Sequence, residues 1–108
     1  MPEIQIKIMS IMDTHQPGFV ECLFSDAWGA VHVVHEKIPV VSCENLWADS
    51  KFPADGAIRC EIINEWVDNE GRKLITVSTE KPDYIETVDG INQFDLLPYQ
   101  LVNFANKH

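Results

Sequence analysis

Residues 57–79 read AIRCEIINEWVDNEGRKLITVST, and this stretch decides the fold class. Two runs rich in β-branched and aromatic residues flank a polar segment from Asp68 to Arg72, which contains a glycine. This pattern predicts two antiparallel strands joined by a three-residue loop, with Gly71 in the left-handed conformation. In that register Asp68 lies opposite Arg72, and each of the remaining side chains of the hairpin can be assigned to one face of the sheet.

The register of this hairpin gives both of its faces apolar side chains. The expected cross-strand pairs are Trp66 with Leu74, Glu65 with Ile75, Asn64 with Thr76, and Ile63 with Val77. A long strand can contact the core with one face near one end and with the other face near the other end, usually because it contains a bulge. We place that bulge at Ile62-Ile63.

Shorter strands are expected through the rest of the chain. Alternating apolar residues predict strands at 4–12, 19–24 and 30–36, and a second hairpin with strands 84–88 and 91–94 around Asp89-Gly90. The proline in residues 38–41 indicates an extended edge or entry segment, and residues 44–49 fit one helical turn. Residues 95–104 fit either a short helix or a closing strand.

About seven short strands joined by tight turns predict an all-β protein. Two architectures fit, a small antiparallel β-barrel or a compact two-layer sandwich built from hairpins, with one short helix allowed at the C-terminal end. The barrel is favoured because both faces of the hairpin at 57–79 are apolar.

Length and composition indicate one soluble domain over residues 1–108. The chain has 108 residues, of which 45% are hydrophobic, and no apolar run approaches the length of about 20 residues that spans a bilayer. Its first residues alternate polar and apolar side chains, unlike a signal peptide, so a cytoplasmic location is expected. The three cysteines, Cys22, Cys43 and Cys60, form no C-x-x-C pair, and Cys22 and Cys60 are expected to be buried.

The net charge is the outlying property of the composition. Eight basic and seventeen acidic residues give a formal net charge of −9. Since phosphate binding needs a concentrated positive surface, nucleic acid is a poor partner, and no membrane partner is expected. A basic protein would be attracted by this charge, although solubility alone is sufficient reason for it.

No residue pattern argues for catalysis, a metal or a cofactor. His32 and His35 are three residues apart on a predicted strand, so they project to opposite faces and do not chelate one ion. A Cys22–His35 nucleophile pair requires both side chains on one face, and a register with Phe24 opposite Val31 places them there only at diagonal range. We therefore predict no catalytic residues, no metal site and no cofactor.

Aromatic residues near acids are the best candidates for a binding surface. Trp28 lies in a predicted hairpin loop, Trp47 in an irregular segment and Tyr84 beside the second hairpin. Such rings next to carboxylates are typical anchors against a basic partner, although they also fill the ends of small cores. The candidate partner-binding residues are Trp28, Trp47, Asp49, Asp55, Tyr84, Glu86 and Asp89.

Three functions fit these features. The first is an acidic protein–protein interaction module, for instance an inhibitor or immunity-type protein that masks a basic partner. The second is a small-ligand-binding or catalytic barrel with an internal cavity lined by His35, Asn64, Thr76 and Ser78. The third is an assembly subunit whose edge strand pairs with a copy of itself.

Overall fold

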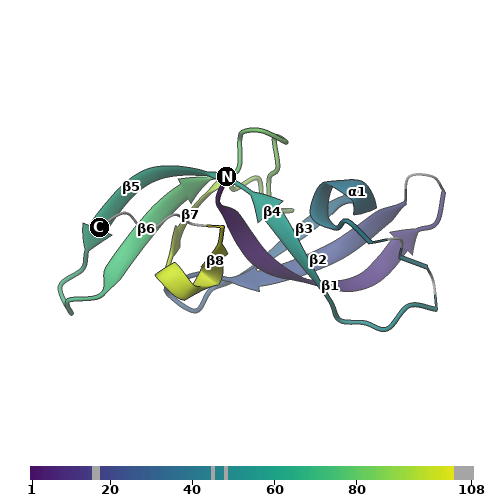
Figure 1. The fold of residues 1–108 in the computed structure, drawn as a ribbon, viewed down its shortest axis with the longest axis horizontal. Coiled ribbons are helices and arrows are strands. Elements are labelled where there is room, and N and C mark those ends of the chain that lie inside the picture. The colour runs from purple at the N-terminus through teal and green to yellow at the C-terminus, as the bar shows by residue number, and fades with distance from the viewer. Residues whose placement is uncertain (16–17, 45, 48, 104–108) are drawn as a thin grey trace.

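A computed structural model describes residues 1–15, 18–44, 46–47 and 49–103. The chain folds into two antiparallel β-sheets with two single-turn helices, and its extents are 45 × 25 × 24 Å. The elements are β1 (Glu3–Asp13), β2 (Phe19–Ser25), β3 (Val31–Lys37), α1 (Ile38–Val41), β4 (Ala54–Arg59), β5 (Glu61–Val67), β6 (Lys73–Ser78), β7 (Gln93–Leu96), the 3-10 helix η1 (Pro98–Gln100) and β8 (Leu101–Val102). Figure 1 shows β5 and β6 at one end of the long axis and β1 to β4 towards the other.

The strand order confirms the all-β class and corrects the preferred barrel. One sheet has the order β3-β2-β1-β4, with β8 also paired to β1, and the other has the order β5-β6-β7. Neither sheet closes on itself. The expected long strand at 57–67 is divided at Cys60, because β4 pairs with β1 whereas β5 pairs with β6. Its apolar faces therefore serve two different sheets instead of one rolled sheet.

Side chains from both sheets form one hydrophobic core. Its fully buried members include Ile4 and Ile8 of β1, Val20 of β2, and Ile75 of β6. Cys22 and Cys60 are buried as expected, and burial raises the pKa of each thiol to about 12. Both thiols therefore stay protonated and behave as small apolar side chains.

The β5–β6 register agrees with the sequence prediction up to the bulge. Trp66 pairs with Leu74 and Asn64 with Thr76, as expected. A register shift follows between Ile62 and Asn64, so Val77 faces Ile62 instead of Ile63. The bulge thus lies at the predicted doublet, and it leaves Ile63 55% exposed on the outer edge of the sheet.

The expected β2–β3 register is wrong by one residue. Phe24 pairs with His32, not with Val31, because the loop closes with a backbone hydrogen bond from Asp26 to Ala30. A shift of one residue moves every side chain of a strand to the opposite face. His32 consequently lies on the core side of the sheet, and His35 on the outer side beside Glu21.

Two irregular segments differ from their sequence predictions. Residues 38–41 form α1 instead of an extended segment, because the ring of Pro39 presets the backbone of a first helical turn. Of the helical turn expected at 44–49, Asn45 and Ala48 lie outside the described residues, and the amide of Ser50 donates to the carbonyl of Trp47 in a plain turn.

The second hairpin and the C-terminal segment are partly as expected. The reversal at Asp89-Gly90 is present, but of its two predicted strands only β7 forms, and β7 pairs with β6. The C-terminal segment contains η1 and then β8, which pairs with β1 as a closing strand. Phe104 lies outside the described residues. No helix in the described part of the chain is long and apolar enough to cross a membrane.

Candidate functional site

Three chain reversals use the same five-residue turn. In each, the first residue's amide donates to the carbonyl of the fifth, and the glycine amide donates back to the carbonyl of the first. The first side chain accepts hydrogen bonds from the amides of the third and fifth residues. The three turns are Asp26–Ala30, Asp68–Arg72 and Thr87–Ile91, with glycine φ angles of 82°, 81° and 80°. This geometry fixes the direction of the side chains at each tip.

The turn at Asp68 is expected to make the stability of the protein depend on pH. The backbone amide of Arg72 is the main cause that holds the pKa of Asp68 below its ordinary value, and the Arg72 guanidinium adds to it. This stabilisation is present above the pKa of the unfolded state and is lost as pH falls through the lower folded-state pKa. We expect Asp68→Asn to be less stable than the wild type near neutral pH, with the difference shrinking below about pH 4. Urea unfolding at several pH values measures it, and a pH-independent difference would contradict this cause.

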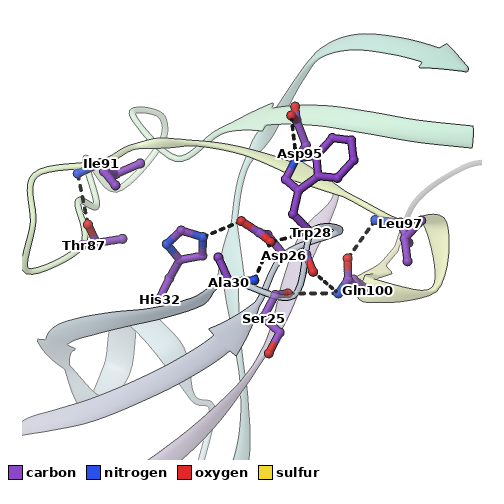
Figure 2. Close-up of polar contacts among 10 residues, drawn as sticks. All are labelled: Ser25, Asp26, Trp28, Ala30, His32, Thr87, Ile91, Asp95, Leu97 and Gln100. Carbon is purple, nitrogen blue, oxygen red and sulfur yellow. Dashed lines mark hydrogen bonds and ion pairs between the residues drawn. The ribbon is translucent and has the colours of Figure 1, made fainter. Parts of the chain in front are cut away.

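The turn at Asp26 joins the two sheets (Figure 2). The Asp26 carboxylate accepts hydrogen bonds from the amides of Trp28 and Ala30, and its other oxygen lies 2.8 Å from Nε2 of His32. The His32 ring packs against Phe24 and Phe94, with centroid distances of 5.2 and 4.9 Å. These contacts fit the structural role expected for His32.

Trp28 is exposed, yet its ring is held from several sides. Its Nε1 donates to Asp95 across 3.1 Å, and Thr76 donates to the same carboxylate across 2.6 Å. The guanidinium of Arg72 lies 5.4 Å from the Trp28 ring, and the Trp66 ring is 6.3 Å away. Trp28 remains 52% exposed, so the structure presents an immobilised indole at the surface.

Tyr84 belongs to a second loop with a fixed backbone, residues 80–91, which we call the acidic loop. Thr79 is buried at the base of this loop and forms two hydrogen bonds with Ile85. The Thr79 hydroxyl donates to the carbonyl of Ile85, and the amide of Ile85 donates to the carbonyl of Thr79. The amide of Val88 binds the carbonyl of Val33 on β3. Tyr84 adopts φ 52° and is 66% exposed. A non-glycine residue in this region costs free energy and is kept only when the surroundings impose it.

The charge of the acidic loop is mostly uncompensated. It contains four carboxylates and one lysine. Asp83 forms a two-point ion pair with Arg59 of β4, at 2.8 and 3.2 Å. Glu86 and Asp89 are exposed, and the ion pairs within the described chain give neither of them a lysine or arginine partner. Tyr84 is therefore displayed among free carboxylates.

The other predicted site residues lie elsewhere. Trp47 is 62% exposed, and Asp49 is exposed close to it in the irregular segment before β4. Asp55 lies on β4 and pairs with Lys7 of β1. No hydrogen bond or ion pair of the described residues joins any two of the seven candidates. The structure thus groups Tyr84, Glu86 and Asp89 on one loop and leaves Trp28, Trp47, Asp49 and Asp55 outside it.

The four residues proposed to line an internal cavity do not converge. His35 lies on the outer face of β3, where it contacts Glu21, and Asn64 is exposed on β5. Thr76 and Ser78 share the β6 face opposite to that of Ile75 and Val77, where Ser78 is buried and Thr76 is engaged with Asp95. The predicted lining is therefore wrong, because it combines residues from two separate sheets.

The structure also separates the residues tested for a nucleophile or a metal. Cys22 is buried on the core face of β2, whereas His35 is exposed on the outer face of β3. His32 and His35 point to opposite faces, as expected. Among the described residues, no group of three or more His, Cys, Asp or Glu side chains could hold a metal ion.

Comparison of the chain with protein-family models, with curated proteins and with solved structures finds no match. Function is therefore inferred from geometry and charge.

Sequence reasoning missed the contacts that fix the exposed rings. Nothing in the sequence indicates that Asp95 and Trp66 contact Trp28, because they approach it only where the β2–β3 loop lies against the second sheet. Thr79 was likewise not singled out, since its partner Ile85 becomes a neighbour only when the acidic loop closes. The D-x-x-G and T-x-x-G spacings at 26–29, 68–71 and 87–90 were the available signal for the turns.

Proposed function

We propose that this protein is a protein–protein interaction module that binds a basic partner through the acidic loop. The observation that carries the proposal is Tyr84, which is held exposed in a left-handed backbone conformation beside Glu86 and Asp89. A loop already fixed in its bound shape loses less conformational entropy on association, and an exposed aromatic ring is a typical anchor of an interface.

Charge supports a basic partner in particular. The formal net charge of −9 attracts a cationic protein at long range, and the free carboxylates of Glu86 and Asp89 place part of that charge beside the anchor. An inhibitor or immunity-type protein that masks the basic active surface of its target works in this way.

Partner binding is expected to depend on the acidic loop and on salt. Proteins retained from native lysate by the wild type at about 50 mM salt, but lost at about 500 mM, are purified and titrated by calorimetry. We expect Glu86→Gln/Asp89→Asn to weaken binding at least about tenfold. Tyr84→Gly removes the anchor while relieving the left-handed strain, so it should weaken binding similarly without loss of folding stability.

The matched control makes the same charge change elsewhere. Glu61→Gln/Glu70→Gln removes two exposed carboxylates from the β5–β6 hairpin. If this control weakens binding as much as the loop variant does, net charge and not the acidic loop explains the affinity. A lysate with no protein that distinguishes the wild type from Tyr84→Gly would also contradict the proposal.

A further inference from the structure

In the described part of the chain, the strand orders of the two sheets end at β3, β4, β5 and β7, and the two-residue β8 pairs with β1 alone. Alternate residues of an edge strand direct their amide and carbonyl groups away from the sheet. Such a row of groups is a template for another strand, and proteins usually cover it or interrupt it. The treatment of each edge therefore indicates whether it is available for binding.

Three of these edges are covered or interrupted. On β3 the outward carbonyl of Val33 accepts a hydrogen bond of 2.9 Å from Val88, and on β7 that of Asp95 accepts one of 2.8 Å from Ala27. On β5 the ladder is broken by the bulge at Ile63, which lies between the carboxylates of Glu61 and Glu65. A bulge and charged residues are common devices against edge pairing.

β4 has a different edge. The amide of Cys60 donates to the carbonyl of Pro2, which continues the β1–β4 ladder by one pair. Since hydrogen-bonded pairs alternate in an antiparallel ladder, Gly56 and Ile58 bond to β1. Asp55, Ala57 and Arg59 must then direct their amide and carbonyl groups outward, and within the described residues these groups have no hydrogen-bond partner. β4 contains neither a bulge nor a proline, and its two charged side chains, Asp55 and Arg59, are held in ion pairs with Lys7 and Asp83.

A groove of about 570 Å³ follows this open edge. One wall consists of Asp55, Gly56, Ala57 and Arg59, and the other is formed by residues 39–44. Gly56 allows the two walls to approach, because a Cβ atom there would lie 2.8 Å from the carbonyl oxygen of Val41. The small residues Gly56 and Ala57 leave the backbone of β4 accessible from the groove.

The charges around the groove favour a cationic occupant. Its lining contains three carboxylates, those of Glu3, Glu44 and Asp55, and one cation, Arg59. Arg59 is paired with Asp83 and Asp55 with Lys7, so the carboxylates of Glu3 and Glu44 are the ones without a lysine or arginine partner among the described residues. A second copy of this chain is a poorer occupant, since both copies have a net charge of −9. Its own residues 39–44 would also have to enter the space that the groove leaves for one strand.

We propose that β4 binds an extended, cationic segment of a partner protein by strand addition, with the outward groups of Asp55, Ala57 and Arg59 forming the new ladder. This interaction does not depend on the acidic loop. The Arg59–Asp83 ion pair nevertheless connects the end of the groove to that loop, so one partner can contact both surfaces.

The test uses a blocked octapeptide of alternating lysine and valine, titrated to millimolar concentration into the ¹⁵N-labelled full chain. We expect chemical-shift changes and slower hydrogen exchange at the amides of Asp55, Ala57 and Arg59. Ala57→Pro removes the central outward donor without removing a bond to β1, and should weaken binding at least about tenfold. His35→Pro makes the same change at an outward position of β3 and should leave binding unchanged.

Further titrations distinguish strand addition from attraction by charge alone and from self-association. A peptide N-methylated at every amide tests the same hydrogen bonds without altering the protein, and should not bind. Equal binding of that peptide, equal binding of a glutamate–valine octapeptide, or absence of shifts at β4 would overturn the proposal. So would concentration-dependent dimerisation that protects the β4 amides without peptide, because a second copy would then be the occupant. Tyr84→Gly should bind the octapeptide as the wild type does, which distinguishes this surface from the acidic loop.

Discussion

Replacing Asp26 by alanine is expected to lower the free energy of unfolding by about 3 kcal/mol. The substitution removes the acceptor of two backbone amides, those of Trp28 and Ala30, and the partner of His32 between two phenylalanine rings. His32 has a side chain only 13% exposed, and a buried polar group left without a partner costs more than the mean value of a hydrogen bond. Urea denaturation followed by tryptophan fluorescence measures the loss.

The control for Asp26 is the same substitution in an identical turn. Asp68→Ala removes equivalent bonds to the amides of Glu70 and Arg72, together with the ion pair to the Arg72 guanidinium, at a hairpin tip away from the hydrophobic core. Its loss of stability should be clearly smaller. If the two variants lose the same stability, the contact of Asp26 with His32 contributes no more than the exposed ion pair of Asp68 with Arg72.

Gly56→Val is expected to lower the free energy of unfolding by about 3 kcal/mol. A Cβ atom at Gly56 would lie 2.8 Å from the backbone oxygen of Val41 and 2.9 Å from Cδ1 of Ile8. Either α1 must therefore move away from β4, or β4 must move away from β1. Ala57→Val enlarges the next residue on the outer face of the same strand and should change stability by less than about 0.5 kcal/mol. Equal losses in the two variants would show that β-branched residues are poorly tolerated along β4 as a whole.

Local patterns predicted the individual strands well, and contacts between distant segments explain the errors. The alternation of Ile4, Ile6 and Ile8 requires a half-buried strand wherever it lies, and Gly71 requires a tight reversal. The barrel was wrong because nothing local shows that the chain changes sheets at Cys60. The β2–β3 register was wrong because the loop was placed one residue too early, and only the Asp26–Ala30 bond defines its closure.

The sequence indicated which residues of the candidate site are exposed, but not how the backbone holds them. Exposure of Tyr84, Glu86 and Asp89 follows from polar neighbours and a turn signal, and all three share one loop. The left-handed backbone of Tyr84 did not follow, because it depends on the two bonds between Thr79 and Ile85, six residues apart. The open edge of β4 likewise depends on strand order, which composition and periodicity do not define.

In the turn shared by residues 26–30, 68–72 and 87–91, the positions that form the turn differ from the positions whose side chains lie at its tip. Only the first residue and the glycine are needed for its backbone bonds, and the second and third positions already hold pairs as different as Ala27-Trp28, Asn69-Glu70 and Val88-Asp89. Substitutions at those two positions can therefore keep the backbone bonds of the turn. Tips of this kind give a small protein a way to follow a partner whose surface changes over evolutionary time.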